Sequence, residues 1–183
     1  WDISPATLRP VPLEHAPFGS ILGEDNRPFK TRSGDVVPLI GLLREAIDRA
    51  AAIVREKNPD LSADRQRAVA QAVGIGAVKY ADLRQDRIQD YVFSWPRMLS
   101  FEGNTGPYLQ YGLTRVAGIF RKAGLTREHV RQARHPVALA APQELAVARA
   151  LLQLGPTVEA VARDLKPHYL CTYLYDLTSA FFS

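Results

Sequence analysis

Apolar positions recur at intervals of three and four residues along most of the chain, a pattern typical of amphipathic helices. It is clearest in residues 39–57 and in residues 63–83, where Ser62 is a suitable N-cap. Gly74 and Gly76 interrupt the second of these helices, which predicts close packing or a bend there. The same pattern predicts further helices at residues 107–122, 127–134, 142–154, 157–165 and 167–182.

The first part of the chain has a different pattern. Residues 1–34 are rich in proline and glycine and contain one strand-like run, residues 18–22, which ends in a turn sequence. Residues 86–104 lack a helical period and hold four aromatic side chains, which predicts an ordered connection pinned by aromatics. The fold class is therefore mainly α: a short α/β lead-in followed by an all-α bundle, with the boundary near residues 80–105.

Two faces of the predicted helix at residues 107–122 differ in chemistry. One is an apolar stripe, expected to be the core side, formed by Leu109, Leu113, Val116 and Phe120. The other, centred roughly 130° away at 100° per residue, carries Tyr108, Tyr111, Arg115 and Lys122. Flat rings with a nearby guanidinium are how proteins hold unstacked bases of single-stranded RNA. From spacing alone, the favoured alternative is that both tyrosines are half-buried at the bundle edge with satisfied hydroxyls.

The charge distribution leaves two interpretations open. The net charge is +4, and residues 115–134 hold six basic residues against the single acid Glu128. Such a block is either a solvated helix face or the electrostatic footprint of a polyanion partner. A lone cysteine, Cys171, excludes a disulfide framework and a cysteine-built metal site, which favours the cytoplasm. No apolar run of the roughly 18 residues needed to span a membrane is expected.

A basic loop follows the predicted strand. Residues 27–34 have the sequence RPFKTRSG. After the Pro-Phe pair come two cations and two hydroxyls in alternation, and then a glycine. Such a loop can close over a phosphate chain, with Lys30 and Arg32 neutralising charge on pyrophosphate. Basic surface loops are common, however, and most bind nothing in particular, so the loop alone carries little weight.

Four blocks, in a fixed order, carry a likeness to a known family. They are LEHAPFG at residues 13–19 running into RPFKTRSGD at 27–35, AVGIGAVKYADL at 72–83, DYVFSWPRMLSFEGNTGPYLQY at 90–111 with Arg115 and FRKA at 120–123, and LYDL at 174–177. Together they cover nearly the whole chain, which resembles the bacterial-type arginyl-tRNA synthetases of class I. One departure is Ser94-Trp95-Pro96, where the family usually has acids around the tryptophan.

The resemblance implies an enzyme that uses ATP, with Mg²⁺ expected alongside it, to activate L-arginine and then transfers arginine to tRNA-Arg. It implies three parts: residues 1–35 as the end of a Rossmann-type nucleotide-binding catalytic domain with the ATP loop, 36–90 as a helical connecting region, and 91–183 as a truncated anticodon-binding helical bundle. The class I His-x-Gly-His signature and the arginine pocket are not in this sequence. We therefore expect a piece of a longer chain that does not aminoacylate by itself.

The resemblance also assigns residues. Those expected near ATP are His15, Phe29, Lys30, Thr31 and Arg32; Thr31 stands where the second lysine of the Lys-Met-Ser-Lys-Ser signature would be. The family's anticodon-contacting pattern, Tyr-x-x-Tyr-x-x-x-Arg, falls on Tyr108, Tyr111 and Arg115, with Asn104, Gln110 and Lys122 as plausible neighbours.

Three hypotheses follow from this: a synthetase portion, a stand-alone helical RNA-binding module without catalysis, and a structural bundle whose tyrosines are buried against protein. We expect a cytoplasmic protein, or an organellar one, with no membrane or DNA partner and no metal site built by its own residues.

Overall fold

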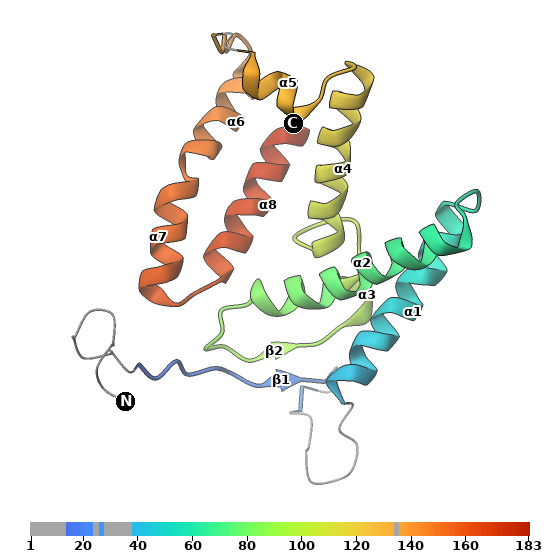
Figure 1. Ribbon diagram of the computed structural model, residues 1–183. Coiled ribbons are helices and arrows are strands. Elements are labelled where there is room, and N and C mark those ends of the chain that lie inside the picture. Colours follow the sequence, from blue (N-terminus) through green and yellow to red (C-terminus); the bar gives the residue numbers. More distant parts are fainter. Residues whose placement is uncertain (1–13, 24–25, 28–37, 134–135) are drawn as a thin grey trace, which may run out of the picture.

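The computed structural model describes residues 14–23, 26–27, 38–133 and 136–183. These residues are mainly helical, as the sequence predicted, and their two short strands, β1 (Ile21–Leu22) and β2 (Tyr91–Val92), pair in parallel (Figure 1). The helices are α1 (Leu39–Lys57), α2 (Ala63–Leu83), α3 (Trp95–Met98), α4 (Gly106–Lys122), α5 (Arg127–Gln132), α6 (Pro142–Leu152), α7 (Leu154–Asp164) and α8 (His168–Phe182).

Element boundaries agree closely with the hydrophobic pattern in the long helices. The predicted bounds of α1 and α2 are confirmed, and the Ser62 side chain accepts a hydrogen bond from the Arg65 amide at 3.4 Å. The pattern missed β2 and α3, which lie inside the segment predicted as a connection, and β1 is shorter than the predicted strand. Strand pairing joins residues about 70 positions apart in the sequence, so local periodicity does not reveal it.

Small residues bring the long helices together. A Cβ atom on Gly74 would lie 2.7 Å from the carbonyl oxygen of Ala46, a fully buried residue of α1. Likewise, a Cβ atom on Gly106 would lie 2.9 Å from the Gly76 carbonyl oxygen, where α4 crosses α2. The predicted close packing at the two α2 glycines is therefore confirmed, and α1, α2 and α4 approach backbone to backbone.

The predicted core stripe of α4 is wrong in one respect. Leu113 is 59% exposed, whereas the buried positions of this helix are Gly106, Pro107 and Gly112. Gly112 lies against Thr178 of α8, where an added Cβ atom would be only 2.7 Å from the Thr178 methyl carbon. Helix α4 therefore packs through small residues, which a search for large apolar side chains does not find.

Helices α6, α7 and α8 complete the bundle that stands above the α1–α2 pair in Figure 1, with α6 and α7 packed along α8. By length and composition alone, the stretch Pro142–Asp164 is apolar enough to cross a membrane, which corrects our expectation of no such run. One stretch of this kind is weak evidence for a membrane span. Here it forms two helices that meet at Gln153 and contact α8.

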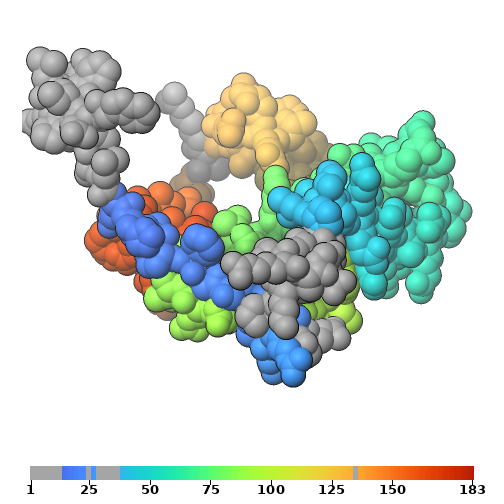
Figure 2. All heavy atoms as spheres, turned by 90° about the horizontal axis from the view of Figure 1, so that it is seen from below, coloured from blue at the N-terminus to red at the C-terminus, as the bar shows by residue number. Residues whose placement is uncertain are grey.

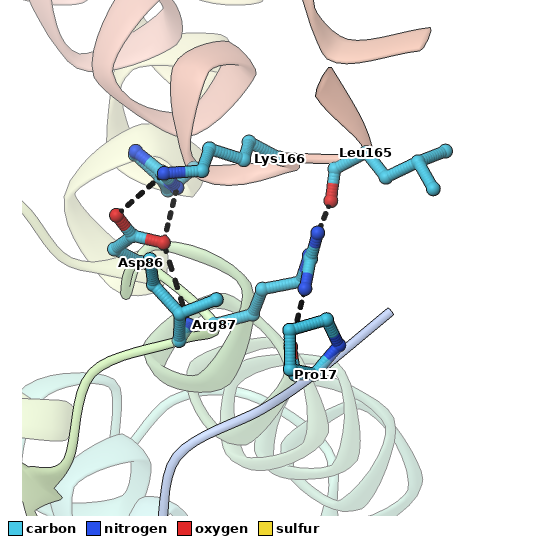
Figure 3. A network of polar contacts seen from close by, with 7 residues as sticks. Pro17, Asp86, Arg87, Leu165 and Lys166 are labelled. Atoms are coloured by element: carbon cyan, nitrogen blue, oxygen red, sulfur yellow. Dashed lines mark hydrogen bonds and ion pairs between the residues drawn. The ribbon is translucent and has the colours of Figure 1, made fainter. Parts of the chain in front are cut away.

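A polar network joins the lead-in, the end of α2 and the start of α8 (Figure 3). Arg87 donates from Nε to the Leu165 carbonyl at 2.8 Å and from its terminal nitrogen to the Pro17 carbonyl. Lys166 Nζ lies 2.9 Å from Asp86 Oδ2, which lowers the pKa of the Asp86 carboxyl and raises that of Lys166. Figure 2 shows residues 14–23 in blue running across the surface of the connecting segment that holds Arg87, in green.

Candidate nucleic-acid interface on helix α4

The start of α4 is fixed by local hydrogen bonds. The Thr105 hydroxyl accepts a hydrogen bond from the Tyr108 amide at 3.2 Å and donates one to the Ser100 carbonyl at 2.6 Å. Pro107 occupies the first turn, where its missing N–H costs nothing, and Gly103 adopts a φ of 74° in the preceding loop. This cap holds the helix that carries the residues Tyr108, Tyr111, Arg115 and Lys122, which we call the tyrosine face.

Tyr108 lies at the edge of the bundle and is half-buried. Its ring is 5.5 Å from the Tyr175 ring and 5.6 Å from the Phe182 ring, both of α8. Its hydroxyl lies 3.3 Å from the Ser179 hydroxyl. Of the two arrangements that spacing left open, Tyr108 therefore adopts the half-buried one with a satisfied hydroxyl.

Tyr111 is the more open of the two tyrosines, with 45% of its surface exposed. Its ring centroid is 5.7 Å from that of Phe182, so α8 supports the ring while part of it stays open to solvent. Arg115 and Lys122 are exposed further along the helix, and within the described part of the chain neither forms an ion pair. The tyrosine face thus offers one supported ring and two available cations.

Two of the residues expected beside the tyrosine face point elsewhere. Gln110 donates from Nε2 to the Ala72 carbonyl of α2 at 2.9 Å, and its Oε1 atom is buried. Asn104 Oδ1 lies 2.6 Å from the Tyr80 hydroxyl, which also lies 2.9 Å from the Cys171 carbonyl oxygen. Gln110 and Asn104 therefore anchor α4 to α2 rather than extend the tyrosine face.

Sequence reasoning missed the residues that support this surface. Tyr80 is buried, and its hydroxyl connects α2, the loop before α4 and α8; burial raises the pKa of this phenol well above its ordinary value. Phe182, Tyr175 and Ser179 of α8 form the backing of Tyr108. Their spacing of three, four and seven residues was a usable signal, since it places all three on one face of α8.

The ATP-side predictions fall mostly outside the described residues. Phe29, Lys30, Thr31 and Arg32 all lie there. His15 is described and exposed, and the segment beside it is held by Arg87 through Pro17 and by the Gly19 amide, which donates to the Arg87 carbonyl at 2.6 Å. Among the residues that the structure describes, no group of three or more His, Cys, Asp or Glu side chains is arranged to hold a metal ion.

Comparison with known proteins decides the family. Residues 6–95 match the model for tRNA synthetases class I (R), catalytic domain, and residues 109–183 match the DALR anticodon binding domain. The chain is 54% identical over 173 residues to the arginine–tRNA ligase of Cellvibrio japonicus and 54% identical over 171 residues to that of Klebsiella pneumoniae. The chain belongs to the arginyl-tRNA synthetase family.

Solved structures of this family agree with the fold. The Thermus thermophilus arginyl-tRNA synthetase is 34% identical with a TM-score of 0.74, and the Plasmodium falciparum enzyme is 28% identical with a TM-score of 0.71; each comparison covers 90% of this chain. The chain covers 26% and 27% of those two chains and 29% of the two bacterial relatives. A match to the catalytic domain does not favour the hypothesis of a stand-alone RNA-binding module.

Proposed function

We propose that this chain is the part of an arginine–tRNA ligase that contributes the ATP loop and recognises the anticodon of tRNA-Arg. The whole enzyme would activate L-arginine with ATP and transfer it to tRNA-Arg. The observation that carries the proposal is the tyrosine face, with an open, supported Tyr111 ring, on a helix at the start of the match to an anticodon-binding domain.

The geometry suggests a division of roles along α4. Tyr111 offers a flat ring to an unstacked base, and each such stack is worth about 1 to 3 kcal/mol. Arg115 lies one turn further on, about 6 Å along the helix axis, where a guanidinium can pair with a phosphate or stack on the next base. The Tyr108 ring packs on α8 and so holds α4 in place, and it offers a base only the part of the ring that α8 does not cover.

The remaining assignments extend this proposal toward the nucleotide. His15, Phe29, Lys30, Thr31 and Arg32 would contact ATP, with Mg²⁺ bound to its phosphates, in the catalytic part spanning residues 1–35. Residues 36–90 would connect this part to the anticodon-binding bundle of residues 91–183. The identity to bacterial arginine–tRNA ligases supports these roles and a cytoplasmic location.

A binding titration of this chain against tRNA-Arg with intact and altered anticodons tests the proposal. Tyr111→Ala should weaken binding of the intact tRNA about 5- to 150-fold, because it removes one stack. Leu113→Ala is the matched control, since Leu113 is exposed on another side of the same helix, and it should bind normally. Equal affinity of the unmodified protein for both tRNAs, together with no loss in Tyr111→Ala, would refute the proposal.

A further inference from the structure

A second polar surface lies away from the tyrosine face. Where the end of α2, the β2–α3 segment and the start of α4 meet, they enclose a cavity of about 300 Å³. The residues that line it include Arg84 and Arg97 and no aspartate or glutamate. Tyr111 lies five residues beyond Gly106, and on a helix these two positions point about 140° apart, so the cavity and the Tyr111 ring are separate surfaces.

The two arginines lack a protein counter-ion. Within the described part of the chain, neither guanidinium takes part in a hydrogen bond or an ion pair. Arg84 is partly withdrawn from water, and its charge acts on buried neighbours, lowering the pKa values of Tyr80 and Cys171 against the larger upward effect of burial. A partly desolvated cation is costly unless an anion pairs with it.

Neutral donors complete the wall. Ser94 precedes α3 as its N-cap residue, but its hydroxyl makes no capping hydrogen bond and remains available. Gln85 adds a side-chain amide from the end of α2. The Tyr80 and Thr105 hydroxyls are already engaged within the protein, so they shape the cavity and leave ligand binding to the arginines, Ser94 and Gln85.

From this arrangement we infer that the cavity binds a phosphate group. A guanidinium presents a planar fork of N–H donors that matches phosphate oxygens, and two such groups neutralise up to two negative charges. The group belongs either to an RNA backbone or to a free phosphate, since both present the same oxygens. This inference does not require anticodon recognition, because it rests on the cavity and not on the tyrosine face.

Nuclear magnetic resonance of the arginine Nε–Hε groups reports directly on the site. In one titration the chain receives inorganic phosphate, and in another a short single-stranded RNA, each at constant ionic strength. We expect saturable shifts of the Arg84 and Arg97 signals in at least one titration. Shifts with both ligands assign the site to any phosphate, and shifts with RNA alone assign it to a phosphodiester. No saturable shift with either ligand would overturn the inference.

Two variants and two controls make the test independent of folding defects. Ser94→Asp places a carboxylate in the cavity while keeping a preferred N-cap residue for α3, so the fold should persist and phosphate affinity should fall at least about tenfold. Arg84→Gln should have a similar effect. Arg67→Gln, on the exposed start of α2, should bind normally. Normal binding by folded Ser94→Asp would contradict the inference, and Tyr111→Ala should leave inorganic phosphate binding unchanged even if anticodon recognition is lost.

Discussion

The region formed by α1, α2 and α4 and the region formed by α5, α6 and α7 are packed very differently. In the first, glycines place one backbone against another, and the core contains the fully buried Ala46, Ala50 and Ala77. In the second, none of the three helices buries a residue, and Gly155 of α7 has no atom of another element within 4 Å of an added Cβ.

The proposed binding surface lies on the more tightly packed of these two regions. The close-packed region fixes the start of α4, which carries the tyrosine face and one wall of the cavity. Local opening costs least where few apolar contacts are buried. We therefore expect α5, α6 and α7 to show faster amide hydrogen exchange than α1 and α2.

A substitution at Gly74 should destabilise the close-packed region more than any other change considered below. Gly74→Val pushes a branched side chain into the α1 backbone, where the first atom alone would lie 2.7 Å from the Ala46 carbonyl oxygen. We expect a loss of about 3 kcal/mol in the free energy of unfolding measured in urea. Gly155→Val is the matched control and should change stability by less than about 0.5 kcal/mol. Equal effects at the two glycines would refute the contrast between the regions.

A smaller effect is expected at the buried hydrogen bonds of Tyr80, which connect α2 to the bundle. Tyr80→Phe removes the buried hydroxyl that lies beside Asn104 and the Cys171 carbonyl, and should lower the free energy of unfolding by about 1 to 2 kcal/mol. Tyr91→Phe should cost less, because its hydroxyl is 3.3 Å from Asp82 Oδ1 on an exposed rim. If the free energy of unfolding in urea is as high for Tyr80→Phe as for Tyr91→Phe, or higher, the buried hydrogen bonds of Tyr80 do not stabilise the fold.

The smallest effect concerns the ion pair between Asp86, just after α2, and Lys166, just before α8. The Asp86 pKa lies below its ordinary value of 3.8, chiefly because Lys166 donates a hydrogen bond, with His168 Nδ1 also 4.0 Å away. Because the carboxyl pKa is lower in the folded protein than in the unfolded chain, the pair stabilises the fold at any pH above the pKa of the unfolded chain. That stabilisation is lost as the pH falls through the pKa of the folded protein. The Lys166 pKa is raised from its ordinary value of 10.5, so its contribution to stability is fully present below pH 10.5. It is lost as the pH rises through the higher pKa of the folded protein.

Asp86→Asn should therefore lower the melting temperature by a few degrees at pH 7. The difference from the unmodified protein should shrink below about pH 4, where the carboxyl becomes protonated. Asp64→Asn is the control, because the Asp64–Arg67 pair is highly exposed, and its melting temperature should be nearly unchanged. A pH-independent difference for Asp86→Asn would mean that the ion pair is not its cause.

Features set by residues close together in the sequence were predictable, whereas features set by distant contacts were not. Helices α1 and α2 were predictable because their apolar period and the Ser62 N-cap act within a few residues. The Tyr108 and Tyr111 face of α4 was predictable in composition for the same reason. Its packing was not, since the period of one helix does not show that Gly112 would meet Thr178 or that Leu113 would stay exposed.

From the amino-acid sequence one can identify the helices, the pairing of two tyrosines with an arginine on one face, and the family, through motifs in a fixed order. Three features depend instead on how distant segments pack. Tyr108 packs on α8 while Tyr111 stays open, Gln110 and Asn104 face inward, and Arg84 and Arg97 line one cavity that no acidic residue lines. This difference arises because helix formation depends on residues within one or two turns, whereas burial and charge pairing depend on which distant surfaces meet.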